Sequence, residues 1–274
     1  MSIAIERVAV CSWSLQPTSP QALVDAMREI GLTRVQIGLN PILDGGQWTN
    51  CSAILQDAGI TLVSGMLATV GEDYSSLGTI KATGGIVPDS TWPKSWANIQ
   101  AMAPIAASLK LKLVTFHLGF VPQHEHDPAY QTLVKRVIQI ADLYQSHGID
   151  LGFETGQEDA PTLQAFLEQV DRPNVGVNFD PANMVLYDKG DPIAALHTLA
   201  PLLKQCHIKD AIRATTVGNW GLEVAVGTGQ INWSKFFTTL DELGYRGLFA
   251  IEREAGEQRV ADVKAATHYI TNLS

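Results

Sequence analysis

Short apolar runs alternate with longer amphipathic segments from one end of the chain to the other. Eight runs rich in β-branched residues have the length of strands and lie at 7–13, 34–38, 61–66, 112–117, 149–154, 174–179, 204–209 and 247–252. Segments with helical periodicity lie between them, at 18–31, 127–148, 159–170, 190–203 and 232–244. Several of these segments begin with Ser or Asp before Pro and several end in Gly, as helices do. The pattern predicts strands that alternate with helices.

This alternation, with short connections, is typical of a parallel sheet covered by helices. Eight such units in 274 residues predict an α/β fold, a single (β/α)₈ TIM barrel that takes up residues 1–274 as one domain. An open doubly wound sheet is the alternative, but no GxGxxG follows the first strand as its dinucleotide-binding version requires. The long Gly-rich connection at 67–96 carries aromatic residues, and we expect it to act as a lid.

The composition and charge of the chain limit the kinds of partner that the protein can bind. Hydrophobic residues make up 46% of the chain and charged residues 17%, and no segment has the length and hydrophobicity of a membrane span. The net charge of −9, with 19 basic residues that form no run, argues against a nucleic-acid partner. We find no secretory signal and expect a cytoplasmic protein. Cys11, Cys51 and Cys206 lack metal-type spacing and fit a reducing compartment, and we interpret Cys206 as a packing residue.

Polar side chains stand where the last four predicted strands end. Glu154 ends the fifth strand, Asp180 follows the sixth, His207 lies in the seventh and Glu252 ends the eighth. The active sites of such barrels lie at the carboxyl ends of the strands, so these groups are expected to converge. Three clustered carboxylates repel one another unless a cation is present. One imidazole with oxygen ligands suits a divalent ion such as Mn²⁺, Co²⁺ or Mg²⁺.

Six motifs in order carry a family resemblance: "TFHLGF", "GFETG", "NFDPANM", "CHIKDAIR", "VAVGTGQINW" and "LFAIERE". The chain resembles the xylose isomerase-like superfamily of sugar isomerases and epimerases, which includes D-tagatose 3-epimerase, hydroxypyruvate isomerase and inosose dehydratase. The resemblance implies that one divalent metal ion (Mn²⁺, Co²⁺, Mg²⁺ or Zn²⁺) is bound by Glu154, Asp180, His207 and Glu252. It also implies that Glu154 and Glu252 are the catalytic acid and base, and that the substrate is a sugar, keto-sugar or cyclitol.

The resemblance further implies a set of substrate-binding residues: Trp13, His117, Asn183, Lys209 and Arg213. Two positions depart from the family pattern. Asn183 stands where many members have His, and Gln36 stands where relatives often have Glu. Asn can bind a hydroxyl but cannot carry a proton near neutral pH. Homo-oligomers are common in the group, and the sequence does not decide whether this protein forms one.

Other interpretations stay open from the sequence. The same site would serve an inosose-type dehydratase or lyase, and a sugar-binding barrel without turnover would keep the pocket. An endonuclease that cuts at abasic sites would need more metal ligands and a basic face, which the chain lacks. Each candidate ligand, taken alone, is equally well explained as a helix cap or ion-paired residue, and Lys209 as a structural bridge. His124, Glu125 and His126 resemble a metal cluster but have the composition of a solvated loop.

Overall fold

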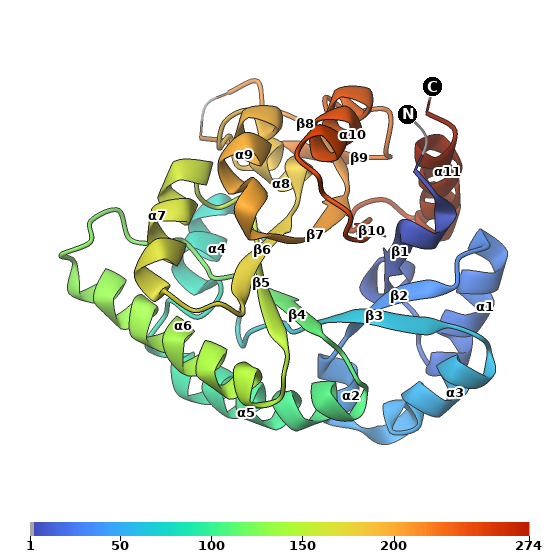
Figure 1. Ribbon diagram of the computed structural model, residues 1–274, viewed down its shortest axis with the longest axis horizontal. Coiled ribbons are helices and arrows are strands. Elements are labelled where there is room, and N and C mark those ends of the chain that lie inside the picture. The colour runs from blue at the N-terminus through green and yellow to red at the C-terminus, as the bar shows by residue number, and fades with distance from the viewer. Residues whose placement is uncertain (1–2, 217, 274) are drawn as a thin grey trace.

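A computed structural model describes residues 3–216 and 218–273. Eight parallel strands close into a barrel in which each strand pairs with the next one along the chain, and helices surround it (Figure 1). The barrel strands are β1 (Val8–Cys11), β2 (Arg34–Gly38), β3 (Thr61–Met66), β4 (Leu113–Phe116), β5 (Asp150–Glu154), β6 (Val175–Phe179), β7 (Leu203–Ile208) and β10 (Phe249–Ile251). The predicted (β/α)₈ barrel and all eight of its strands are confirmed, and the open sheet is excluded.

The helices of the described residues are α1 (Pro20–Ile30), α2 (Asn40–Asp44), α3 (Cys51–Asp57), α4 (Leu77–Thr83), α5 (Trp92–Ser108), α6 (Pro128–Ser146), α7 (Ala160–Val170), α8 (Pro181–Leu186), α9 (Pro192–Leu199), α10 (Trp233–Glu242) and α11 (Arg259–Thr271). The five predicted helices are confirmed as α1, α6, α7, α9 and α10. Their starts follow from the sequence, because side chains such as Ser19 and Asp127 accept a backbone N–H of the first turn. None of the described helices combines the length and hydrophobicity needed to cross a bilayer.

The 67–96 connection holds more regular structure than its composition predicts. Helix α4 lies in the middle of it, and α5 begins at its end. The start of α4 is a capping box in which Ser76 and Thr79 each bond to the other's backbone N–H. Ile80 is the one residue of α4 that is buried, so the helix carries no apolar stripe for a pattern to detect.

A small hairpin outside the barrel was not predicted from the sequence. Its strands, β8 (Asp210–Ile212) and β9 (Leu222–Val224), pair antiparallel directly after β7. The Asp210 carboxylate accepts hydrogen bonds from the backbone N–H of Gly227 and from the indole of Trp233. A Cβ at Gly229 would lie 2.1 Å from Asp210 Oδ1. The glycine-rich "VAVGTGQINW" segment therefore folds around a buried structural carboxylate.

Side chains alternate along β7 between the barrel interior and the helical layer. Cys206 and Ile208 are fully buried within the main hydrophobic core. Gln205 and His207 instead bond to side chains of strands across the barrel. The interpretation of Cys206 as a packing residue is confirmed, and His207 is brought into the interior by the two-residue period of the strand.

Candidate active site

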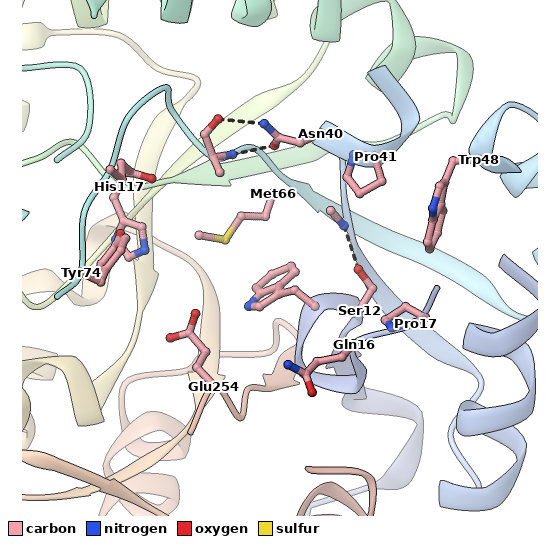
Figure 2. A pocket seen from close by; sticks show the side chains of 14 residues that line it. Ser12, Gln16, Pro17, Asn40, Pro41, Trp48, Met66, Tyr74, His117 and Glu254 are labelled. Carbon is pink, nitrogen blue, oxygen red and sulfur yellow. Dashed lines mark hydrogen bonds between the residues drawn. The ribbon is translucent and has the colours of Figure 1, made fainter. Parts of the chain in front are cut away.

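A cleft at the carboxyl ends of the barrel strands consists of two cavities that share Tyr74, His117 and Glu254. The first cavity, of about 440 Å³, is shown in Figure 2 and is lined by Ser12, Trp13, Gln16, Pro17, Gly38, Asn40, Pro41, Trp48, Met66, Ala68, Glu72 and the three shared residues. The second cavity, of about 460 Å³, is lined by Asn183, Leu186, Tyr187, Lys209, Trp220, Gly221, Leu222, Glu223, Ala255 and the same three. Tyr74 comes from the 67–96 connection, so this segment forms part of the cleft wall.

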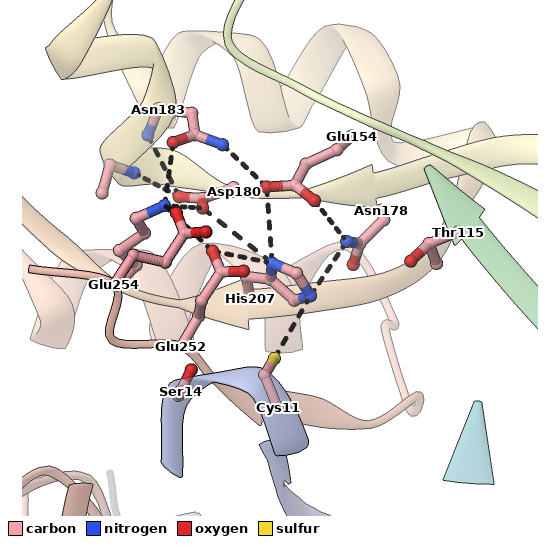
Figure 3. Close-up of polar contacts among 12 residues, drawn as sticks. Cys11, Ser14, Thr115, Glu154, Asn178, Asp180, Asn183, His207, Glu252 and Glu254 are labelled. Carbon is pink, nitrogen blue, oxygen red and sulfur yellow. Dashed lines mark hydrogen bonds and ion pairs between the residues drawn. The ribbon is translucent and has the colours of Figure 1, made fainter. Parts of the chain in front are cut away.

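Four side chains converge beside the cleft (Figure 3). Each of them offers one ligand atom, and these atoms lie within 4.8 Å of one another; the four residues are Glu154, Asp180, His207 and Glu252. All four are buried. The convergence expected from the strand ends is therefore present in the structure.

The spacing of these atoms fits a single divalent ion. His207 Nδ1 lies 3.6 Å from Glu154 Oε1, 3.9 Å from Asp180 Oδ2 and 3.4 Å from Glu252 Oε2. Ligands about 2.1 Å from an octahedral ion lie about 3.0 Å apart when adjacent and about 4.2 Å apart when opposite. The observed distances fall within that range. Asp180 Oδ2 and His207 Nδ1 are buried without a hydrogen-bond partner in the described part of the chain, as atoms awaiting a metal would be.

Asp180 has two functions in its local structure. One oxygen, Oδ1, accepts the backbone N–H of Ala182 at 2.8 Å and of Asn183 at 3.1 Å, which caps α8. This bond fixes the carboxylate so that Oδ2 faces the cluster. Burial raises the pKa of Asp180 to about 7, and the neighbouring carboxylates oppose its ionisation as well. The helix-cap interpretation and the ligand interpretation are therefore compatible at this residue.

His207 is oriented by a hydrogen bond from its other ring nitrogen. Nε2 lies 2.8 Å from Gln36 Oε1, and an amide oxygen only accepts, so Nε2 carries the proton and Nδ1 keeps its lone pair. Gln36 is itself held by Gln205 and Thr115, whose bonds with it measure 2.8 and 2.7 Å. Gln36, one of the two positions expected to differ from the family pattern, thus supports the candidate metal ligand.

The two candidate catalytic carboxylates are held by different neighbours. Glu154 Oε1 accepts a hydrogen bond from Asn183 Nδ2 at 2.7 Å, and its Oε2 lies 3.8 Å from His117 Nε2. Glu252 Oε1 accepts one from the indole of Trp13 at 2.8 Å. Asn183, His117 and Trp13, all predicted as substrate-binding residues, therefore contact the cluster directly and also line the cleft.

Lys209 is the buried cation of the site. Its Nζ lies 3.0 Å from Glu252 Oε2 and 2.6 Å from Glu254 Oε2, and it donates to Asn183 Oδ1 at 3.2 Å. Burial alone would raise the pKa of Glu252, but the positive charge of Lys209 outweighs this effect and helps hold that pKa well below its ordinary value. These contacts agree with the interpretation of Lys209 as a structural bridge.

Arg213 is the one predicted site residue that the structure does not bring to the cleft. It follows β8 directly, and its guanidinium pairs with Asp188 and donates to the carbonyl of Gly190, so it is not among the residues that line either cavity. The exposed side chains of His124 and His126 confirm the solvated-loop interpretation of 123–127.

Sequence reasoning missed most of the residues that line the cleft, among them Glu254 and Tyr74, which both cavities share. Glu254 lies two positions after Glu252, the spacing of side chains on one side of an extended strand, and this spacing could have identified it. Tyr74 had a weaker signal, as an aromatic residue in a long loop. Its ring lies 6.2 Å from that of His117 and 6.3 Å from that of Trp220, between centroids.

Comparison with known proteins defines the class. The chain belongs to the xylose isomerase-like TIM barrel family, whose model matches residues 24–273. A xylose isomerase domain protein from Planctomyces limnophilus is 32% identical, with a TM-score of 0.86 over 97% of this chain and 95% of that one. A xylose isomerase-like TIM barrel protein from Mycobacterium smegmatis, solved in complex with magnesium, is 18% identical, with a TM-score of 0.74 over 98% and 97% of the chains.

A curated relative bears a more specific name. A ketose 3-epimerase from Arthrobacter globiformis is 28% identical over 88 residues, which are 32% of this chain and 27% of that protein. The matches to curated relatives span less than half of those proteins' own length.

Proposed function

We propose that the protein is a divalent-metal-dependent isomerase or epimerase that transfers a proton at a carbon next to a carbonyl in a sugar, keto-sugar or cyclitol. One observation carries the proposal. Four ligand atoms from successive barrel strands converge in a buried position beside a cleft, and two of them, Asp180 Oδ2 and His207 Nδ1, have no hydrogen-bond partner among the described residues.

Glu154, Asp180, His207 and Glu252 would hold the ion, which could be Mn²⁺, Co²⁺, Mg²⁺ or Zn²⁺. When bound, the metal polarises the substrate's oxygens and offsets the negative charge that develops when a proton leaves the adjacent carbon. The magnesium reported with the relative from Mycobacterium smegmatis supports a hard divalent ion.

The proton transfer falls to Glu154 and Glu252. They extend from β5 and from the end of β10, which flank β6 and β7 on opposite sides, so each can approach the reacting carbon from its own side. Neighbouring positive charge lowers the pKa of both against the effect of burial, and ionised carboxylates are ready to accept a proton. Asn183 and Trp13 hold one oxygen of each carboxylate and thereby aim the other.

A dehydratase is the second candidate, and Lys209 favours it. This ammonium group lines the second cavity and donates to Glu252 at 3.0 Å, so it stands where a departing hydroxyl would need a proton donor. The first step, removal of a proton next to a carbonyl, is common to both reactions. Analysis of the product therefore decides between them: an isomer retains the mass of the substrate, whereas a dehydrated product is lighter by one water.

The test is uptake of deuterium from D₂O into keto-sugars and inososes by metal-loaded protein, followed by mass spectrometry. The expected result is exchange at a carbon beside the carbonyl. Glu154→Gln and Glu252→Gln should each lower the rate about 10²- to 10⁴-fold while the circular dichroism spectrum stays unchanged. Glu125→Gln, in an exposed loop, is the matched control and should exchange normally. Full activity in either active-site variant would refute the acid–base assignment.

A further inference from the structure

The cleft also indicates which sugars it accepts. We propose that the substrate is an uncharged sugar that carries a second ring, such as a ketose glycoside, with the reacting ring over the metal ligands and the second ring in the first cavity. This inference rests on the proposed function, and it names the substrate class that the function leaves open.

The charges of the residues that line the cleft disfavour an anionic substrate. Glu72, Glu223 and Glu254 line it, and Lys209 is the one Lys or Arg among the described lining residues. Its ammonium already pairs with Glu252 and Glu254, at 3.0 and 2.6 Å. A phosphate ester carries about −1.5 to −2 charges near neutral pH and is bound by Arg, Lys or clustered N–H donors. Here such a group would meet carboxylates instead.

The cleft is larger than one sugar ring requires. Each of its cavities falls by volume within the range of about 300–1,000 Å³ that is usual for a complete small-molecule site. The metal cluster lies at their junction, because Trp13 of the first cavity and Lys209 of the second both contact Glu252. A ring held at the cluster therefore leaves the outer part of the first cavity for a substituent.

The outer part of the first cavity has mainly apolar walls. Trp48 and Pro41 line it on the side opposite His117 (Figure 2). The Asn40 side chain faces the cavity but already bonds to the backbone N–H and C=O of Ala68, at 2.8 and 3.0 Å. Its polar atoms are thus occupied. Aromatic faces of this kind suit the apolar face of a sugar ring.

Gln16 offers the polar contact that a second ring would need. Its backbone has the left-handed conformation, with φ of 48°, which is uncommon outside glycine and is found at binding sites. The side chain lines the first cavity and makes no hydrogen bond with any residue of the described ranges. An amide so placed can both donate to and accept from ring hydroxyls.

Three ketoses that differ only at O6 test this inference: D-fructose, D-fructose 6-phosphate and isomaltulose, in which a glucosyl group occupies O6. The readout is kcat/KM for solvent proton exchange by metal-loaded protein. We expect isomaltulose to exceed fructose by about three- to tenfold, the effect of one or two added contacts, and the phosphate to fall at least about tenfold below fructose. A preference for the phosphate, or for free fructose over the disaccharide, would overturn the inference.

Two variants locate the effect. Gln16→Gly keeps a residue suited to the left-handed backbone, and Trp48→Leu keeps an apolar side chain. Each should lower kcat/KM for isomaltulose relative to that for fructose and so remove the preference for the disaccharide. Lys110→Gly is the matched control, since Lys110 is exposed, has a φ of 59° and precedes β4 at the other end of the barrel. Exchange of all three ketoses without discrimination would refute this inference alone. Exchange of none of them, and of none of the other keto-sugars and inososes tested with the metal-loaded protein, would refute the proposed function.

Discussion

Glu158 is a buried carboxyl group that we expect to lower the folding stability as the pH rises. Its carboxyl group is buried just before α7 and accepts the backbone N–H of Val121 at 2.6 Å, which ties the loop after β4 to the loop after β5. Burial raises the pKa of Glu158 from 4.5 to about 7. The folded protein therefore holds the proton of this carboxyl group more tightly than the unfolded chain does.

The raised pKa of Glu158 makes the folding stability depend on pH. In the unfolded chain the group loses its proton near pH 4.5, whereas in the folded protein it does so near pH 7. The folded state thus binds more protons between these values, and stability falls as the pH rises through them. This difference in pKa corresponds to about 3 kcal/mol of lost folding stability. The loss is present in full above pH 7 and nearly absent below pH 4.5.

Glu158→Gln keeps an oxygen for the Val121 bond and removes the titration. As the pH rises from 5 to 8, we expect the folding stability of the variant to increase relative to that of the wild type by about 2 kcal/mol, or about 4–8 °C in Tm. The assay is thermal unfolding followed by circular dichroism, with EDTA present so that metal binding does not contribute. Glu168→Gln, exposed on α7, is the control. A difference in Tm between variant and wild type that is the same at both pH values would refute the reasoning.

Three further predictions concern the site. Gln36→Leu should weaken Mn²⁺ binding about 10- to 100-fold by calorimetry, because His207 Nε2 loses its acceptor; unchanged affinity would mean that the bond does not orient the ring. Tyr74→Ala should raise KM and leave Mn²⁺ affinity as it is. An unchanged KM with weaker Mn²⁺ binding would show that Tyr74 does not contact the substrate. Asn183→Ala should lower kcat, since Glu154 Oε1 loses its 2.7 Å partner; an unchanged kcat would show that this bond does not aim the carboxylate.

The barrel and the ligand cluster could be predicted because both depend on local patterns. Each strand has its own apolar run, and Glu154, Asp180 and Glu252 each stand where a run ends. Parallel strands in a closed barrel bring their carboxyl ends together, so order along the chain was enough to predict convergence. The same reasoning identified His207 by its place in β7.

Residues whose environment depends on loops or on contacts across the barrel could not be predicted in this way. Gln36 supports His207 from 171 positions away, and no local pattern indicates that pairing. Arg213 was expected at the substrate, but a hairpin of three-residue strands turns it toward Asp188. Tyr74 reaches the cleft only through the path of the 67–96 connection, in which the short helix α4 buries a single side chain.

The central claim is that the carboxylate–imidazole cluster is a metal site, and elemental analysis tests it most directly. The wild-type protein and the Asp180→Ala variant would be incubated with Mn²⁺, Co²⁺, Mg²⁺ and Zn²⁺ in turn, freed of excess ion and analysed. The account predicts about one ion per chain in the wild type and its loss in the variant, because Asp180 Oδ2 is a buried candidate ligand without a hydrogen-bond partner among the described residues. A wild-type protein that retains none of these ions, or a variant that retains one equally well, would contradict it.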